Sequence, residues 1–244
     1  MGQILARGLG ALDDMDVVAL IDPHEPAELY GAQYRADLES VEPIVVDVVV
    51  DFSVAVNVVH SARWCAAHKV ALVVGTTGLG ANHRAELAAA GERTGVVVAA
   101  NFAIGAVLAE RFAAWAAPYF ERAEVIELHH DTKADAPSGT AIAAAHAIAA
   151  ARREAGRGPI TDTTTTWTLE NARGADAGDG VRVHSVRLPG LVAHQEILFG
   201  GPGEGLLVRH DAYDRASFVP GVALAIRTMN RDAGLVEGLA ALLS

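Results

Sequence analysis

Residues 124–141 read EVIELHHDTKADAPSGTA, and this stretch decides how the second half of the chain is interpreted. It opens as a strand, because β-branched and aliphatic residues stand between acids. The apolar character is lost at the pair His129-His130, and Lys133 follows after a short loop. Pro137-Ser138-Gly139-Thr140 then starts an alanine-rich run that continues to about Arg153, with Gly156 as a stop signal. The sequence therefore predicts a strand, a loop and a capped helix.

This order of residues predicts a binding site for a small anion. Unpaired N–H groups and the positive end of the helix dipole favour negative charge at a helix N-terminus. Lys133 adds a mobile positive charge, and either His129 or His130 can give or take a proton near neutral pH. We therefore expect a carboxylate- or phosphate-bearing molecule and acid–base chemistry.

Structural interpretations compete with this one. A histidine at a strand end is more often structural than catalytic, and Ser-Gly-Thr before a helix is commonly only a cap. A metal site made of His129, His130 and Asp131 is disfavoured, since neighbouring residues on a strand point to opposite faces. We expect no metal. The coincidence of all these parts in one stretch favours a functional site.

The same stretch resembles the signature of the dihydrodipicolinate reductase family, nicotinamide-dependent enzymes of the diaminopimelate route to lysine. Every fixed position of that signature is met between Glu124 and Ala141, and Thr132 stands where a third histidine is common. The resemblance covers nearly the whole chain, including the segments GTTG at 75–78, ANF at 100–102 and the region from 173 to 221.

The resemblance implies NADH- or NADPH-dependent reduction of a cyclic dicarboxylate imine or of its dehydrated form, so the expected partner is a small dicarboxylate. It makes His129 and Lys133 the catalytic candidates, with His129 as the proton donor. The cofactor would supply the hydride, and the protein would supply orientation and electrostatics. The expected substrate-binding residues are His130, Lys133, Ser138, Gly139, Thr140 and Thr77.

The first hundred residues predict a Rossmann-like, doubly wound parallel sheet in an α/β fold. Buried strands are expected at 17–21, 44–52, 70–74 and 96–99, with helices at 57–68 and 81–93 between them. The valine run predicts a strand buried on both faces, and residues 25–42 are expected to be polar and irregular. Such sheets bind ligands at the carboxyl ends of their strands. Together with this rule, the resemblance implies that the cofactor-binding residues are Gly2, Asp22, Phe52, Gly75, Thr76, Thr77, Ala100, Asn101, Phe102, Arg215 and Phe218.

Asp22 follows the strand expected at 17–21, where an acid commonly binds the adenosine ribose. No arginine stands beside it for a 2′-phosphate, which favours NADH without excluding NADPH. Acids at strand ends also cap turns.

Residues 1–9 predict a helix, which in this fold follows the first strand and a glycine-rich turn that Gly2 would end. About a dozen upstream residues are therefore expected. We favour a misplaced start codon as the explanation. The alternative is a truncated, non-catalytic oligomeric ligand-binding homologue, and in either case this chain is expected to bind the dinucleotide poorly.

The organisation changes after Asn101. A helix is expected at about 105–117, then the signature, a long loop at 156–180 and successive strands at 181–188, 193–199 and 205–209. This order predicts a second α+β domain with a mixed or antiparallel sheet over residues 102–215. Residues 1–101 and 216–244, with a last helix at 221–229, would form the dinucleotide-binding domain. The open sheet favours self-association, and the resemblance implies a homotetramer.

Composition narrows the class of protein further. The chain has 244 residues, a net charge of −11 and a single cysteine, Cys65. One cysteine excludes an internal disulfide and is typical of a reducing cytoplasm. No basic patch indicates nucleic acid, and no apolar run reaches the ~20 residues of a membrane span. The net charge repels an anionic substrate at long range, so a local basic site has to overcome it.

Overall fold

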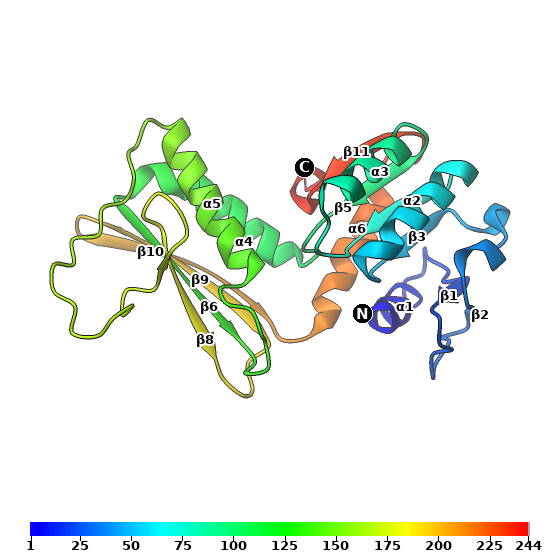
Figure 1. Cartoon of the computed structure of the whole chain (residues 1–244), viewed down its shortest axis with the longest axis horizontal. Coiled ribbons are helices and arrows are strands. Elements are labelled where there is room, and N and C mark those ends of the chain that lie inside the picture. The colour runs from blue at the N-terminus through cyan, green and yellow to red at the C-terminus, as the bar shows by residue number, and fades with distance from the viewer. Residues whose placement is uncertain (244) are drawn as a thin grey trace. The chain divides into compact units, whose positions relative to one another are not determined.

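The computed structural model describes residues 1–243, which form two compact units. The first unit comprises residues 1–104 together with the chain from Arg215 onward, and the second comprises Gly105–Asp214 (Figure 1). Within residues 1–243, no helix is both long and apolar enough to cross a bilayer.

The first unit is built on a four-stranded parallel sheet, as its apolar runs and intervening helices predict. The strand order is β11-β5-β4-β3, and every neighbouring pair is parallel. All four residues of β4 are buried, which fits the continuous apolar run at 70–74. The strands are β3 (Val48–Asp51), β4 (Ala71–Val74), β5 (Gly95–Val98) and β11 (Gly234–Glu237), and the helices are α1 (Gly2–Leu9), α2 (Ala55–His68), α3 (Ala81–Gly91) and α6 (Val219–Thr228).

The expectation of one continuous sheet in this unit is wrong in one respect. Strand β1 (Ala19–Ile21) pairs in parallel with β2 (Gln33–Arg35) as a separate two-stranded sheet. A cleft of about 680 Å³ is lined by both β1 and β3 and by the apolar face of α1. The first three residues of β3, Val48, Val49 and Val50, are therefore only half-buried. This strand was predicted to be buried on both faces, but one of its faces borders the cleft.

Four elements of the first unit differ from the expectation. Residues Pro43–Val45 form a short 3₁₀ helix, so β3 begins later than the valine run does. Strand β2 lies within the segment expected to be irregular, and a second 3₁₀ helix covers Leu38–Ser40. Strand β11, near the carboxyl end, was not predicted; its register with β5 runs from Gly234 opposite Gly95 to Glu237 opposite Val98.

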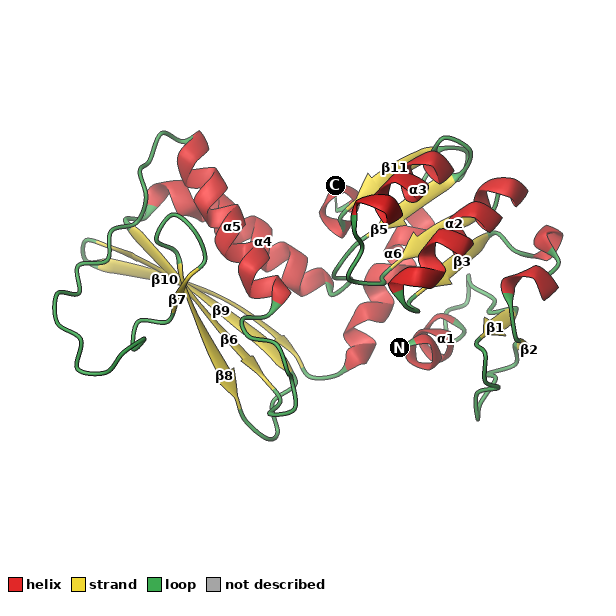
Figure 2. Cartoon of the chain, in the orientation of Figure 1, coloured by secondary structure: helices red, strands yellow, loops and turns green. Residues whose placement is uncertain are grey.

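The second unit is a five-stranded mixed sheet with two helices on one face (Figure 2). The order is β10-β9-β6-β8-β7, in which only the β6–β8 pair is parallel. This confirms the predicted mixed sheet. Its elements are α4 (Ile104–Ala116), β6 (Arg122–His129), α5 (Gly139–Glu154), β7 (Ala175–Asp176), β8 (Arg182–Arg187), β9 (Ala193–Gly201) and β10 (Glu204–Ala212).

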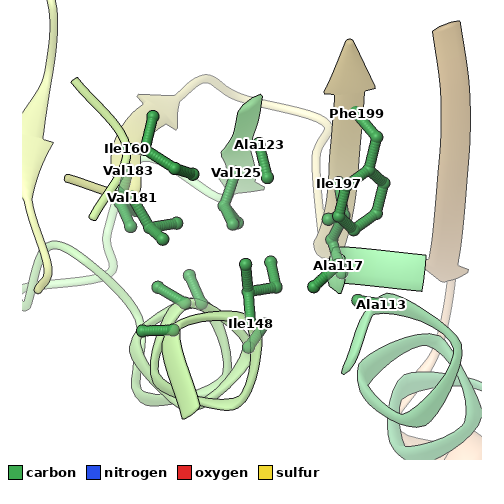
Figure 3. Close-up of a cluster of buried hydrophobic side chains, with 14 of the residues drawn as sticks. Ala113, Ala117, Ala123, Val125, Ile148, Ile160, Val181, Val183, Ile197 and Phe199 are labelled. Carbon is green, nitrogen blue, oxygen red and sulfur yellow. The ribbon is translucent and has the colours of Figure 1, made fainter. Parts of the chain in front are cut away.

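The core of this unit lies between the sheet and the helices (Figure 3). Alternation along β6 sends Ala123, Val125 and Glu127 to the helix side, while Glu124 and Ile126 face the other way. Val125 packs in the same cluster as Ile148 of α5. Small alanine side chains on the inner face of α5 let the helix approach the sheet closely, and this fixes the helix start beside the end of β6.

The single cysteine belongs to the core of the first unit. Cys65 of α2 is fully buried and has no disulfide partner. Burial raises the pKa of its thiol to about 12, and the nearby Asp51 carboxylate adds to this effect.

Candidate functional site

The end of β6 holds a buried carboxylate against a histidine. Glu127 and His129 lie two residues apart and so share one face of the strand. The Glu127 side chain has 0% exposure, and one of its oxygens is hydrogen-bonded to Nδ1 of His129. Arg187, on the neighbouring strand β8, donates from Nη1 and Nη2 to the two oxygens of Glu127 at 2.8 Å each. The three side chains form one connected group.

The charge state of Glu127 follows from this arrangement. Burial raises the pKa of Glu127, but hydrogen bonds with Arg187, Ser185 and His129 outweigh burial and hold the pKa below its ordinary value. Glu127 is therefore ionised at neutral pH.

Burial acts in the opposite direction on His129. It lowers the pKa of His129, and the positive charges of Lys133 and Arg187 lower it further, while contact with Glu127 raises it in part. The net pKa lies below the ordinary histidine value. His129 is therefore a neutral imidazole at neutral pH in the free protein.

The loop after β6 places the lysine near the same group. Lys133 N–H donates to the His130 carbonyl at 3.2 Å, which closes a turn. The Lys133 ammonium contacts Asp135 at 2.6 Å, and His130 Nδ1 lies 2.7 Å from the Thr132 hydroxyl. Arg187 also donates to the Asp135 carbonyl at 2.8 Å. The loop that carries Lys133 is thus tied to the pair that holds His129.

Helix α5 begins at the end of this loop, as predicted. Its N-cap is Ser138, whose hydroxyl accepts a 3.2 Å hydrogen bond from the Ala141 N–H, and whose own N–H donates to Glu127 at 3.3 Å. Ser138 is buried, and these two bonds give it a structural role. Gly139 is exposed and a Cβ there would meet nothing within 4 Å, so its N–H remains well placed for an anion together with Thr140.

The second unit thus brings His129, His130, Lys133 and the first turn of α5 into one local region. Thr77, the other residue expected to bind substrate, belongs to the first unit. The arrangement can hold a carboxylate and move a proton, because it combines a lysine, the start of a helix and an imidazole backed by a carboxylate.

In the first unit, the loop after β4 is organised by a buried acid. Asp51, at the end of β3, accepts hydrogen bonds from Ser53, from Ser61 at 2.7 Å and from the Thr76 hydroxyl at 3.1 Å, and its carbonyl accepts from Gly75 N–H at 2.9 Å. The Thr76 hydroxyl is therefore turned inward, whereas Thr77 is exposed. Of these two threonines, Thr77 is the one whose hydroxyl can reach a ligand.

Aromatic side chains pack together at the carboxyl end of β3, next to the loop after β4. The Phe52 ring lies 5.4 Å from Phe102 and 6.5 Å from Phe218, measured between centroids. A Cβ at Gly75 would collide with the Phe52 ring, so only glycine permits this approach. Phe102 has no exposed side-chain surface, which leaves only its main chain for a ligand.

The remaining expected cofactor residues lie at the ends of elements in the first unit. Asp22 follows β1 and accepts from the His24 N–H at 2.9 Å, and the Asn101 carboxamide oxygen accepts from the Ala103 N–H at 2.9 Å. Gly2 opens α1, and a Cβ there would meet nothing within 4 Å. Ala100 and Arg215 are exposed. Strand ends with an acid, close-approach glycines and an open helix start fit a dinucleotide.

Comparison with known proteins agrees with this geometry. Two family models described as dihydrodipicolinate reductase match the chain, the N-terminus model over residues 1–102 and the C-terminus model over residues 105–243. The chain belongs to the dihydrodipicolinate reductase family. A curated family member from Nocardia farcinica, named 4-hydroxy-tetrahydrodipicolinate reductase, is 48% identical over 242 residues, which cover 98% of this chain and 92% of the relative. A Streptococcus pneumoniae member of the same name is 44% identical and covers 100% and 95%.

Solved structures place the fold in the same family. A dipicolinate-bound dihydrodipicolinate reductase from a Paenisporosarcina species superimposes with a TM-score of 0.86 at 40% identity, covering 98% of this chain and 94% of that one. An amine dehydrogenase from Mycobacterium smegmatis has a TM-score of 0.59 at 14% identity, which indicates a shared fold alone. The curated members support a nicotinamide-dependent reductase over a non-catalytic ligand-binding homologue.

Three residues important to the site were given no role from the sequence: Glu127, Arg187 and Asp51. Glu127 had a usable signal, because it continues the inward-facing positions of Ala123 and Val125 on β6. An acid on the buried face of a strand requires a charged or hydrogen-bonding partner. Arg187, 60 residues away, had no local signal.

Proposed function

We propose that this chain catalyses the NAD(P)H-dependent reduction of 4-hydroxy-tetrahydrodipicolinate to tetrahydrodipicolinate, within diaminopimelate and lysine biosynthesis. The observation that carries the proposal is the imidazole of His129, held by Glu127 within the same local region as Lys133 and the start of α5. This is an acid–base group beside a carboxylate-binding site, in a chain whose curated relatives carry the name of that reductase.

Each group in the second unit has a distinct task. Lys133, His130 and the N–H groups of Gly139 and Thr140 hold a carboxylate of the substrate through charge-assisted hydrogen bonds. Reduction of a carbon–nitrogen or conjugated double bond leaves negative charge on one of its atoms. His129 delivers the proton that quenches this charge. Ser138 acts indirectly, since its two hydrogen bonds fix the first turn of α5 against Glu127.

The first unit holds the nicotinamide cofactor, which supplies the hydride when bound. Asp22 would accept hydrogen bonds from the adenosine ribose, and the α1 start at Gly2 would bind the pyrophosphate. The loop Gly75–Thr77 and residues 100–102 hold the nicotinamide half. The Arg35 guanidinium donates to the carbonyls of Tyr34 at 2.9 Å and Ser40 at 3.1 Å, so it is committed within its own loop. This favours NADH over NADPH as the cofactor.

Self-association through the second unit is part of the proposal. Leu198 and Leu207 lie opposite each other on the sheet face away from α5, and both are exposed. An apolar sheet face of this kind is stabilised when a second copy covers it. We assign a homotetramer that works in the cytoplasm, with a small dicarboxylate as its partner molecule.

The test is a steady-state assay of nicotinamide oxidation with enzymatically generated 4-hydroxy-tetrahydrodipicolinate. The parent should turn over, and His129→Gln should lower kcat by ~10²–10⁴, the usual value of a positioned acid. His146→Gln, on the exposed side of α5, is the matched control and should behave as the parent. No turnover by a parent that binds NADH would overturn the proposed function. Equal kcat for the two variants would remove His129 from the reaction.

A further inference from the structure

We propose that Glu127, clamped by Arg187, is a positioning residue that fixes His129 with its proton on Nδ1, so that Nε2 is the atom that takes up a proton when the dicarboxylate binds and then delivers it. The substrate half of this inference rests on the proposed function. The half that concerns the histidine tautomer does not, because it follows from the free protein alone.

The hydrogen-bond geometry decides the tautomer. An ionised carboxylate only accepts hydrogen bonds. Glu127 already accepts two from Arg187 at 2.8 Å each, and this pairing with a guanidinium keeps it ionised inside the protein. Nδ1 of His129 contacts the same carboxylate, so Nδ1 must carry the hydrogen. In a neutral imidazole the other nitrogen, Nε2, is then a lone-pair acceptor and has no proton to give.

The surroundings of His129 explain why that proton is missing in the free protein. The charged or polar groups around it come from every neighbouring element: Glu127 on β6, Arg187 and Ser185 on β8, Lys133, His130 and Asp135 in the loop, and Ser138 at the start of α5. Strand β9 contributes the uncharged Ala193, directly opposite His129. Burial opposes a positive imidazolium most strongly, and the charges of Lys133 and Arg187 add to this effect, while Glu127 offsets it in part.

A bound dicarboxylate reverses this balance. Two negative charges placed beside Lys133 and the start of α5 offset the positive charges that oppose protonation of His129. An opposite charge within ~4–6 Å favours the charged form of a titrating group. His129 then takes one proton from solvent at Nε2, while Glu127 remains ionised and stabilises the imidazolium through Nδ1–H. Binding of the substrate thus converts His129 to the protonated form, which is the proton donor.

The proton and electron balance closes for the reduction step, and the hydroxyl group of the substrate leaves in a separate step as water. One atom of the substrate double bond accepts the hydride, and the electron pair of that bond moves to the other atom. That atom takes the proton from Nε2 of His129, and the imidazolium returns to the neutral form with its hydrogen on Nδ1. A bound dihydronicotinamide would supply that hydride and would be oxidised to the nicotinamide. One proton from solvent is consumed, by way of Nε2.

The arrangement has a matched control in the same strand. Glu124 lies on the opposite face of β6 and is paired with His184 Nε2 at 2.7 Å and with Arg173. It is the same trio of residue types as Glu127, His129 and Arg187, at a place away from Lys133 and the α5 start. Glu124→Gln therefore disturbs a comparable carboxylate–histidine–arginine group without touching His129.

The first measurement is ¹⁵N NMR of histidine-labelled free protein, with His129→Gln used to assign the signal among the ten histidines. The expected result is an Nδ1–H tautomer for His129 in the parent and in Glu124→Gln, and loss of that preference in Glu127→Gln. An Nε2–H tautomer in the parent overturns the inference while leaving the reductase function standing. Far-ultraviolet circular dichroism confirms that each variant is folded.

The second measurement is calorimetric titration with dipicolinate, a non-reactive dianion, in buffers of different ionisation enthalpy at about pH 8, above the ordinary histidine pKa of ~6.5. The parent and Glu124→Gln should take up close to one proton per dipicolinate bound. His129→Gln should take up none, and Glu127→Gln clearly less than the parent. Unchanged uptake in His129→Gln, or the absence of uptake in the parent, would refute proton delivery through Nε2. Failure of dipicolinate to bind the folded parent would count against the proposed function as well.

Discussion

Arg187 and Glu127 lie on the neighbouring strands β8 and β6 and are joined by two hydrogen bonds, each 2.8 Å long. The Glu127 side chain has no exposed surface, and that of Arg187 retains 19%. The same arginine reaches the Asp135 carbonyl, so a single ion pair connects the proton-carrying histidine with the loop that holds Lys133. Stability and catalysis should therefore both depend on Arg187.

Arg187→Met should destabilise the second unit, because Glu127 would be left buried without its counter-charge. Removing one partner of a fully buried pair costs ~3–5 kcal/mol, and the remaining exposure of Arg187 reduces this to about 2–3 kcal/mol. Urea unfolding measures the change. Arg84→Met is the control, because its 3.2 Å pair with Glu237 is exposed, and it should unfold as the parent does. Similar unfolding midpoints for the two variants would show that the Arg187 pair is not structural.

Lys133→Ala should weaken dicarboxylate binding without changing NADH binding. A hydrogen bond to a charged group contributes ~1.5–3 kcal/mol, which corresponds to roughly a 10- to 150-fold rise in the dissociation constant for dipicolinate. The residues assigned to NADH all lie in the first unit, so its affinity should stay within experimental error. Calorimetry with each ligand tests this division. Loss of NADH binding with dipicolinate binding intact would show that the two binding tasks are divided differently.

The pH dependence of catalysis should differ between kcat and kcat/KM. The active form of His129 is the protonated one, so activity is lost as pH rises through its pKa. In the free protein burial lowers that pKa, so the fall in kcat/KM should begin below the ordinary value of ~6.5. Substrate carboxylates raise the pKa in the complex, so kcat should persist to higher pH. Two coincident profiles, or activity that increases with pH across this range, would contradict the assignment.

The two adjacent threonines of the first unit offer a matched pair of variants. Thr76→Val removes the 3.1 Å hydrogen bond to buried Asp51 and should cost about 1 kcal/mol of stability. Thr77→Val should leave stability unchanged, because its side chain is exposed, but should weaken NADH binding more than Thr76→Val does. Thermal unfolding and NADH titration of both variants provide the test. The reverse pattern would assign the ligand contact to Thr76.

The fold class and most elements could be predicted because their residues carry a local period. The α5 start at Ser138, the buried strand β4 and the mixed sheet of the second unit all follow from such patterns. Strand β11 could not be predicted, since it has four residues, GLVE, and depends on pairing with β5 far away in sequence. The valine run predicted a strand that starts too early and is buried on both faces. In the structure Pro43 begins a 3₁₀ turn, and one face of β3 borders a cleft, and neither feature follows from the run itself.

The site was partly visible in the sequence. His129, Lys133 and the α5 start lie within one short stretch, so spacing alone brings them together. Glu127, the partner of His129, is held by Arg187 of β8, whose position depends on the strand pairing that places it opposite His129. The orientation of Thr76 depends likewise on Asp51, the last residue of another strand. The local sequence pattern predicts which side chains contact a ligand. The pairing of strands determines the orientation and the protonation state of those side chains.

The reactivity of the buried Cys65 thiol can be used to measure local unfolding of the first unit. At a pKa of about 12 almost no thiolate exists at neutral pH, and the sulfur is covered by the core of the first unit. Alkylating reagents can therefore modify it only in molecules in which α2 has transiently opened. As no second cysteine competes, the labelling rate measures the opening equilibrium of that unit directly. A cysteine introduced at any exposed position would react faster by orders of magnitude, so site-specific dyes can be attached without first removing the native thiol.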